Sequence, residues 1–343
     1  MNMSDNHTPV SFAVSADMQS FIDAAQVVAR DVDMDKVSQR DSQASLDHAL
    51  QAVSALQVDA LLESLGADER DPVLLQLAHT LGAARPEAAW QSLLAALERP
   101  LWQALGEPFA KAQTGRVAWA VGATDTMSDG SPRWVVWSPA STLTSDVIWL
   151  LQAEGDRMVG PYTLADLQKA FDVTVEEPVM GLPSGQALWI RTKVATQWAP
   201  QTGLALSTAG MAEAARHQHQ VLLAGLLTGM AQRVSQAAYA YAKTRQSGGK
   251  PIMQHQAVAL RLADIAMNQQ ALWLYVQACF GGDKAGTTLS IGHVHELASR
   301  VTRDGVQVAG AHGFVEGLPF KRLFEQTRTV LTALRATAAV QPQ

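Results

Sequence analysis

Apolar residues in the first third of the chain recur at the three- and four-residue spacing of an amphipathic helix. Pro86 is typical of a helix start, and Asp71 followed by Pro72 predicts another, with the aspartate as the cap and proline at the first helical position. The pattern therefore predicts an N-terminal helical domain over residues 1–112. The apolar stripes are Leu46, Leu50, Val53 and Leu56; Leu74, Leu75, Leu77 and Leu81; and Leu93, Leu94 and Leu97.

The periodicity changes in the middle of the chain. Short runs rich in valine, isoleucine and tryptophan alternate there with clusters of glycine, proline, serine and aspartate. A period of two between turn residues is typical of β-strands, so we expect a small β-domain over residues 113–203. The predicted strands are Arg116–Gly122, Arg133–Trp137, Asp146–Gln152, Phe171–Glu176 and Ala187–Val194.

Helical spacing returns from residue 204 to residue 343, in longer elements. Four long helices in sequence predict a bundle, and such bundles often carry an oligomer interface. Small residues such as Gly225 and Gly229 would let two helices approach closely. The expected fold class is α+β, mainly α: an N-terminal helical domain, a small middle β-domain and a C-terminal long four-helix bundle. The predicted helices are Met211–Arg245, Met253–Phe280, Thr288–Gly310 and Phe320–Val340.

The amino-acid composition of the chain argues against several classes of protein. The chain has 343 residues, of which 48% are hydrophobic, and a net charge of −6, so it is not globally disordered. It contains no basic block, which argues against nucleic-acid binding. A single cysteine, Cys279, excludes a disulfide framework and suits a reducing compartment. The longest apolar stretch, Val221–Ala231, is too short to span a bilayer, and the first residues do not resemble a signal peptide. We therefore expect a cytoplasmic protein.

Two motifs in the last zone carry the most specific signal. The first is GMAQRVSQAAYAYAKTRQSGGKPI at residues 229–252, followed by HQAV at 255–258 and LADIA at 262–266. The second is VQVAGAHGF at residues 306–314, followed by Pro319 and by Arg322-Leu323. In residue types, order and spacing these two motifs resemble those of the C-terminal helical domain of the acyl-CoA dehydrogenases. The resemblance covers residues 205–330 well, and the order of helical, β and helical zones extends it to the rest of the chain.

The resemblance implies a set of cofactor-binding residues. The family's arginine at the position of Arg245 reaches the FAD diphosphate of a neighbouring subunit, and the positions of Gln307 and Gly310 contact the ADP half of that FAD. Ala311 stands where the family has a second glycine. The residue types suit these roles, because a guanidinium pairs with phosphate and a glycine lets backbone approach a ligand.

The catalytic base of the family is missing from its two usual positions. In the family a carboxylate removes the α-proton of an acyl-CoA thioester while the β-hydride passes to the flavin. One position for this glutamate, fifteen residues after the motif proline, holds Leu334. The alternative position, thirteen residues before Gln232, holds His219, which we interpret as a residue of a polar helix face.

Other departures affect the flavin ring and its surroundings. Gly248 replaces an aromatic residue of the family's turn, and Pro139-Ala140-Ser141-Thr142 poorly matches the β-domain loop that holds the isoalloxazine. We expect no metal site at His293 and His295, because no carboxylates cluster with them. We expect His312 near the cofactor edge and Glu316 at the surface.

The retained positions serve a neighbour's FAD, and the lost ones serve the chain's own chemistry. This division favours the non-catalytic subunit of an α2β2 acyl-CoA dehydrogenase heterotetramer, with FAD shared at the interface. By family analogy the substrate is the bulky acyl-CoA of steroid degradation, held in the pocket of the catalytic partner. Two alternatives stay open: a homomeric acyl-CoA dehydrogenase with a relocated base at His219 or Glu316, and a scaffold or binding protein without flavin.

Overall fold

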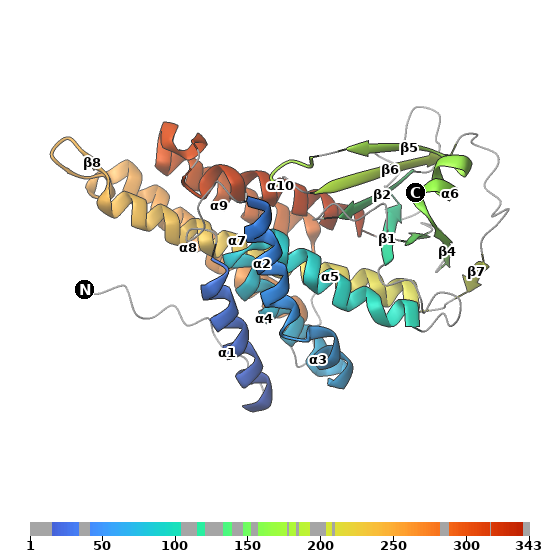
Figure 1. The fold of residues 1–343 in the computed structure, drawn as a ribbon. Coiled ribbons are helices and arrows are strands. Elements are labelled where there is room, and N and C mark those ends of the chain that lie inside the picture. Colours follow the sequence, from blue (N-terminus) through green and yellow to red (C-terminus); the bar gives the residue numbers. More distant parts are fainter. Residues whose placement is uncertain are drawn as a thin grey trace.

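The computed structural model describes residues 16–33, 42–103, 115–120, 133–138, 147–151, 157–176, 178–182, 185–192, 204–207, 210–281, 288–315 and 317–338. A layered body of helices fills one end of the molecule and a twisted sheet lies at the other (Figure 1). The expected order of helical, β and helical zones is confirmed. No helix in these ranges combines the length and the apolar character needed to cross a membrane.

Within the described ranges, five helices precede the sheet. They are α1 (Ala16–Asp31), α2 (Ser42–Ser54), α3 (Val58–Ser64), α4 (Ala67–Ala84) and α5 (Pro86–Gln103). Pro86 opens α5 as predicted, since proline has no N–H for the helix start to leave unpaired.

The predicted start of α4 at Asp71–Pro72 is wrong. The helix begins at Ala67, where the Glu69 carboxylate accepts the backbone N–H of Gly66, and Pro72 lies inside it. The bond that Pro72 cannot donate lies near the helix start, where its loss is tolerated. Asp71 pairs instead with His217 of α7 (Met211–Thr244), and this hydrogen bond raises the pKa of His217.

The described part of the sheet has seven strands in the order β5-β6-β2-β1-β3-β4-β7. The five predicted strands are present within a few residues, and the sequence analysis missed β4, β7 and the short helix α6 (Leu164–Ala170). β7 pairs antiparallel with β4 and carries the sheet beyond residue 203. The strands are β1 (Gly115–Ala120), β2 (Arg133–Ser138), β3 (Val147–Leu151), β4 (Arg157–Tyr162), β5 (Phe171–Glu176), β6 (Gln186–Thr192) and β7 (Leu204–Ser207).

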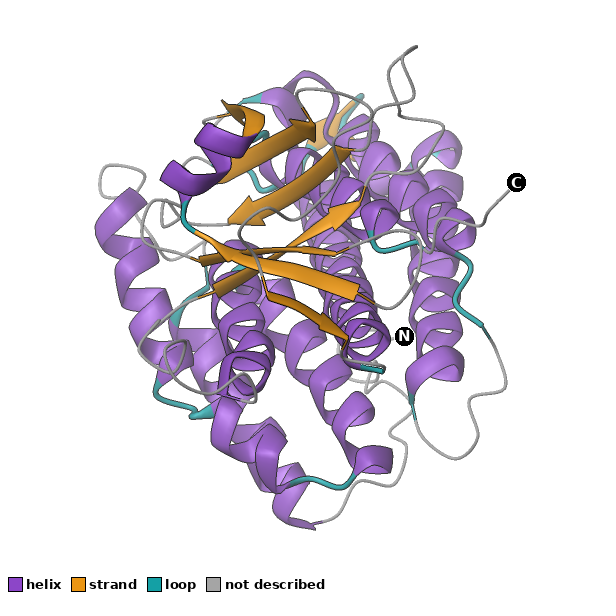
Figure 2. Ribbon diagram, turned by 90° about the vertical axis from the view of Figure 1, so that its right-hand side faces the viewer, coloured by secondary structure: helices purple, strands orange, loops and turns teal. Residues whose placement is uncertain are grey.

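Successive residues of strand β2 point to opposite faces of the sheet and pack into two different hydrophobic cores. Val135 and Trp137 of β2 pack into the main helical core, whereas Trp134 and Val136 join a second cluster with Leu167 of α6. This is the period-two alternation expected of a sheet that is covered on both faces. Helices therefore lie against the sheet, as Figure 2 shows.

The C-terminal bundle is organised around α7. This 34-residue helix packs against α4 and α5 and against the helices that follow it. A Cβ added at Gly229 would lie 2.2 Å from the carbonyl oxygen of His79 in α4, so the expectation of close helix approach is confirmed there. The remaining elements are β8 (Gln246–Ser247), β9 (Lys250–Pro251), η5 (Ile252–Gln254), α8 (Gln256–Phe280), α9 (Ile291–Ala309), η6 (Gly310–Phe314) and α10 (Phe320–Ala336).

Candidate functional site

Arg245 ends α7 with its side chain exposed. Its backbone N–H donates to Tyr241 (2.9 Å), and its carbonyl accepts the N–H of Ile252 (2.8 Å), which closes the β8–β9 hairpin. Gly248 and Gly249 at the hairpin tip have φ of 59° and 77°. The glycine at 248 thus suits a left-handed turn that an aromatic side chain would strain. The hairpin fixes the end of α7 and therefore the position of the Arg245 backbone, from which the guanidinium extends.

The second motif ends α9 and forms η6. Gln307, Gly310 and Ala311 are all exposed there. Gly310 has φ of 60° and donates its N–H to the carbonyls of Gln307 and Val306. Within the described part of the chain nothing lies within 4 Å of the position that a Cβ of Gly310 would take. The backbone at this point is therefore open to close approach by another molecule.

A hydrogen bond between Tyr241 and His312 joins these two segments. The Tyr241 hydroxyl lies 2.9 Å from Nδ1 of His312 and also donates to the carbonyl of Ala309 (3.4 Å). Tyr241 precedes Arg245 by one helical turn, and His312 follows Ala311. The structure thus brings the ends of α7 and α9, which hold the predicted cofactor residues, to the same end of the bundle. Glu316 lies outside the described residues.

Leu334, at the family's position for the catalytic glutamate, is fully buried inside α10. The helix continues beyond it to Ala336, and Gln220 of α7 donates its side-chain amide to the carbonyl of Thr337 (3.2 Å). A side chain at position 334 therefore faces packed helices.

The interpretation of His219 as a polar-face residue is wrong, because its side chain is buried between α7 and α5. Its Nδ1 lies 2.7 Å from the carbonyl oxygen of Ala215, and its Nε2 lies 3.5 Å from Oε1 of Glu98. Glu98 is also buried. Sequence reasoning missed this carboxylate, although Glu98 follows Leu94 by four residues and therefore falls on the apolar stripe of α5. The structure thus sets a carboxylate beside one of the two family base positions.

Arg322, the arginine of the second motif, has a structural partner. It pairs with Glu87 at the start of α5, and the same carboxylate accepts from Gln326 (2.9 Å) and pairs with Arg85 (2.8 Å). Glu87 and Arg85 are both buried. This cluster fastens α10 to the junction of α4 and α5.

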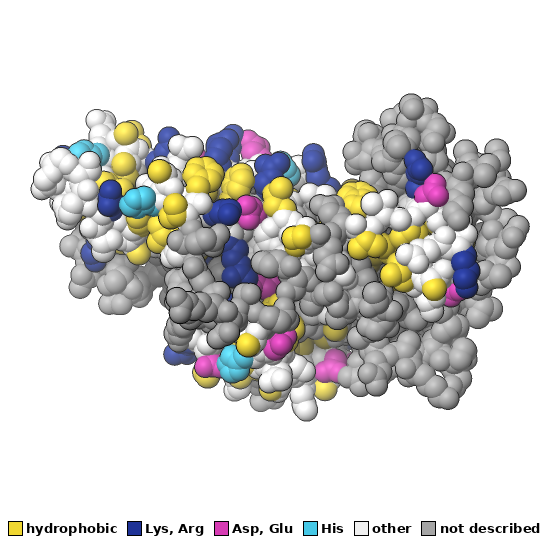
Figure 3. Space-filling model, turned by 45° about the horizontal axis from the view of Figure 1, so that its top comes forward, with side chains coloured by type: hydrophobic (Ala, Val, Ile, Leu, Met, Phe, Trp, Pro, Cys, Tyr) yellow, Lys and Arg dark blue, Asp and Glu magenta, His cyan; other side chains and the backbone are white. Residues whose placement is uncertain are grey.

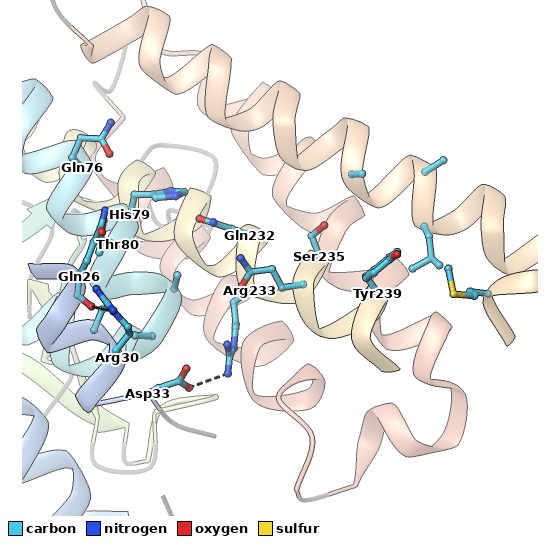
Figure 4. Close-up of a pocket in the computed structure, with 18 of the residues that line it drawn as sticks. Gln26, Arg30, Asp33, Gln76, His79, Thr80, Gln232, Arg233, Ser235 and Tyr239 are labelled. Carbon is cyan, nitrogen blue, oxygen red and sulfur yellow. Dashed lines mark hydrogen bonds and ion pairs between the residues drawn. The ribbon is translucent and has the colours of Figure 1, made fainter. Parts of the chain in front are cut away.

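A groove of about 1160 Å³ runs between α1, α4, α7 and α8. Figure 4 shows Gln26 and Arg30 of α1 and Asp33, two residues beyond the end of α1, at the groove, and Asp33 pairs with Arg233 of α7 (2.9 Å). His79 of α4 lies at its edge and is buried, and desolvation lowers its pKa to about 4 despite a hydrogen bond with Gln232 that raises it. The α8 side of the groove is apolar: it consists of Met253, Ala259, Leu262, Ala263 and Ala266.

No three metal-ligating side chains lie together in the part of the chain that the structure describes. The ring of His293 packs edge-on against Tyr275, with centroids 4.8 Å apart. The described residues thus present an exposed edge at the ends of α7 and α9 and a buried contact between His219 and Glu98.

Comparisons with known proteins agree with the resemblance of the two motifs. Residues 209–333 match the family model for the acyl-CoA dehydrogenase C-terminal domain. Relatives include the caffeyl-CoA reductase–Etf complex subunit CarC of Acetobacterium woodii (29% identical) and a 3-sulfinopropanoyl-CoA desulfinase of Paraburkholderia xenovorans (31% identical). Each match covers 33% of this chain and 31% of the relative, so it spans less than a third of either relative's length.

The likeness of fold extends over nearly the whole chain. Butyryl-CoA dehydrogenase of Megasphaera elsdenii superimposes with a TM-score of 0.63 at 17% identity, over 93% of this chain and 94% of that one. At this identity the match shows the fold. Residues 209–333 thus match the acyl-CoA dehydrogenase C-terminal domain, on a chain whose fold is similar to that of butyryl-CoA dehydrogenase.

Proposed function

We propose that this chain is the non-catalytic subunit of an FAD-dependent acyl-CoA dehydrogenase heterotetramer of α2β2 form. The observation that carries the proposal is Leu334, an aliphatic side chain fully buried in α10 at the position of the family's base. An aliphatic group cannot accept the α-proton of a thioester. The glutamate and most of the thioester pocket would come from a catalytic partner.

The chain's role toward the cofactor would be to close the adenosine end of the partner's FAD. Arg245, Gln307, Gly310 and Ala311 are exposed, and the Tyr241–His312 bond joins the helix ends that carry them. A guanidinium suits a diphosphate, and the open backbone at Gly310 suits a group in van der Waals contact, so these residues fit the ADP half of FAD. Bound FAD supplies the acceptor for the β-hydride of the substrate. Residues 139–142, predicted to match the flavin-ring loop poorly, lie outside the described residues.

Exposed apolar side chains beside this edge support a partner. Phe314 and Val315 are 63% and 51% exposed, three and four residues after Ala311 of the second motif. Large apolar groups gathered at a polar edge are typical of a protein–protein contact. The relative CarC is named as a subunit of a caffeyl-CoA reductase–Etf complex. A multi-subunit assembly of the present chain agrees with that name. A bulky, steroid-type acyl-CoA is the proposed substrate of the partner.

Co-expression with its genomic neighbour tests the proposal, which requires that neighbour to be an acyl-CoA dehydrogenase subunit with the glutamate. We expect a stoichiometric complex with one FAD per heterodimer, and a colourless or insoluble chain when it is made alone. Arg245→Ala should lower FAD retention of the complex, whereas Lys243→Ala, an exposed cation two residues earlier, should not. An isolated chain that is yellow and oxidises a thioester would overturn the proposal. An unchanged FAD content in Arg245→Ala would show that this chain does not hold the cofactor and would favour a scaffold.

The Glu98–His219 pair favours a second candidate, a homomeric acyl-CoA dehydrogenase with a relocated base. A carboxylate and an imidazole are the two side-chain groups that general acid–base catalysis uses most often. In that case the chain by itself should reduce an electron acceptor with an acyl-CoA, and Glu98→Gln should abolish the activity while leaving FAD bound. Activity that survives Glu98→Gln would exclude this candidate.

A further inference from the structure

The groove between α1, α4, α7 and α8 separates polar from apolar side chains. On the face of the molecule in Figure 3, hydrophobic and charged side chains are interspersed along the helices. In the groove, by contrast, the α8 side is apolar, while the α4 and α7 side bears uncharged groups that donate or accept hydrogen bonds (Figure 4). Those groups belong to Gln76, Thr80, Gln232, Ser235, Gln236 and Tyr239. A ligand that fits both sides must therefore have one polar and one apolar face.

The hydrogen-bonding side of the groove is held in place from behind. The Thr228 hydroxyl donates to the Gly225 carbonyl (2.7 Å), so its oxygen accepts from Nδ1 of His79 (2.9 Å). The His79 ring also packs against Trp273 of α8, with centroids 4.2 Å apart, and makes a hydrogen bond with Gln232. Because burial lowers the pKa of His79 to about 4, the ring is neutral at pH 7. These contacts hold the Gln232 amide at the groove before any ligand arrives.

The charged groups at the groove favour an anion. Asp33 is the one carboxylate among the described residues that line the groove, and it pairs with Arg233. Arg30 is exposed, and its Nε donates to the Gln26 carbonyl (3.2 Å), which holds the stem of the guanidinium along α1. The described lining thus has two cations against one carboxylate. A single negative charge on the ligand would balance them.

The size of the groove suits a ligand with several fused rings. Its volume of about 1160 Å³ slightly exceeds the roughly 300–1,000 Å³ of pockets that take drug-sized molecules. Alanine side chains flank Leu262 on the α8 side, so a flat hydrocarbon surface can lie against this helix. A simple acyl chain would fit the α8 side alone. It would leave the hydrogen-bonding groups of the opposite side without partners once water is displaced, which is unfavourable.

We propose that the groove binds a facially amphipathic carboxylate, with hydroxyl groups on one face of a rigid ring system and hydrocarbon on the other. The hydroxyl face lies against α4 and α7, the hydrocarbon face lies against α8, and the carboxylate lies at Arg30. The inference does not rest on the proposed function, because the described lining comes from this chain and requires neither FAD nor a catalytic partner.

Titration calorimetry with cholate, below the concentration at which it forms micelles, tests the ligand class. Cholate has hydroxyl groups on one face of its fused rings and a single carboxylate, and we expect saturable binding of one molecule per chain. Deoxycholate lacks one of these hydroxyl groups and should bind about fivefold more weakly, because one polar group of the protein loses its partner. A merely apolar site would rank the two compounds the other way, since deoxycholate is the more hydrophobic.

Three variants test the location. Ala263→Trp puts a bulky ring into the groove and should weaken cholate binding at least about tenfold, whereas Ala271→Trp, at an exposed alanine of the same helix outside the lining, should not. Arg30→Gln should weaken binding about threefold and reduce its dependence on salt. The three side chains are exposed, so the thermal midpoints without cholate should match that of the parent. The titrations are run on the isolated chain and on the co-purified complex.

The results separate the alternative occupants of the groove. Equal cholate affinity in Ala263→Trp and Ala271→Trp would show binding elsewhere in the chain or in its partner and overturn the inference. Tighter binding of deoxycholate than of cholate, or no saturable binding of either, would also overturn it. So would tighter binding of laurate or AMP, because the occupant would then be a fatty acid or a nucleotide. None of these measurements depends on FAD content or thioester oxidation, so their failure is distinct from failure of the proposed function.

Discussion

The imidazole of His219 and the carboxylate of Glu98 face each other inside the protein, with Nε2 of the histidine 3.5 Å from Oε1 of the glutamate. The Ala215 carbonyl, 2.7 Å from Nδ1, holds a proton on that nitrogen. Nε2 would then oppose the carboxylate as a second acceptor unless a further proton lies on one of the two groups. The two side chains, one from α7 and one from α5, thus join these helices through a buried polar contact.

This pairing predicts a difference between two substitutions of Glu98. Glu98→Ala should lower the free energy of unfolding by about 3 kcal/mol, because it leaves a buried imidazole without its partner. Glu98→Gln should lower it by only about 1 kcal/mol, since an amide N–H can donate to Nε2 of the neutral ring. Urea denaturation at pH 7 measures both. Equal effects of the two substitutions would show that the contact contributes nothing specific.

Restoring the family's glutamate at position 334 should harm the protein. Leu334 is fully buried within α10, so Leu334→Glu would place a carboxylate among apolar helices and destabilise the fold by roughly 3 kcal/mol or more. The variant should gain no thioester oxidation. Leu334→Met, which conserves volume, is the control and should lose less than about 1.5 kcal/mol. Native stability together with new activity in Leu334→Glu would contradict the buried position of this side chain.

The contact between α4 and α7 predicts a large effect from one methyl group. A Cβ at Gly229 would lie 2.2 Å from the His79 carbonyl oxygen and 2.8 Å from the Ala83 amide nitrogen, both backbone atoms that cannot move aside alone. Gly229→Ala should therefore destabilise the protein by about 3 kcal/mol through overpacking. The control is Gly292→Ala near the start of α9, where the nearest atom is 4.0 Å away and the substitution should stabilise slightly. Thermal unfolding of the two variants in opposite directions would confirm this geometry, and equal midpoints would contradict it.

His79 makes stability depend on acid pH. Burial lowers its pKa from 6.5 to about 4, so the unfolded chain binds a proton in this range and the folded chain does not. The contribution of His79 to the free energy of unfolding is therefore fully present above pH 6.5. It falls by roughly 3 kcal/mol in total as the pH drops towards 4. Urea titrations at pH 7, 5.5 and 4.5 measure the loss.

His79→Asn is the matched variant for that measurement. Its amide can take over the contact of Nδ1 with the Thr228 hydroxyl, which spans 2.9 Å, but it does not titrate. The variant should lose clearly less stability than the parent between pH 7 and 4.5. Parallel pH curves for the two proteins would show that His79 is not the group responsible.

The sequence by itself determined most of the helices and strands and the positions of the two motifs at helix ends. Periodicity and turn residues predicted the four C-terminal helices and five of the strands, because these signals arise from neighbours within one or two turns. The two motifs likewise predicted Arg245 and Gly310 at helix ends, and both occupy the ends of their helices. Their role toward FAD stays a prediction.

Tertiary structure decided which side chains meet. Glu98 and His219 are 121 positions apart, and Arg322 and Glu87 are 235 positions apart, yet each pair is in contact. Asp71 and Pro72 match the residue pattern of a helix start, and this led to the wrong prediction for α4. The helix instead starts just after Gly66, whose N–H is bound by Glu69. The rotation and height of one helix against another depend on how both surfaces pack, as at Gly229 against α4, and no local pattern contains that information. For this reason the buried carboxylate and the groove beside α8 could be found only once the helices were assembled.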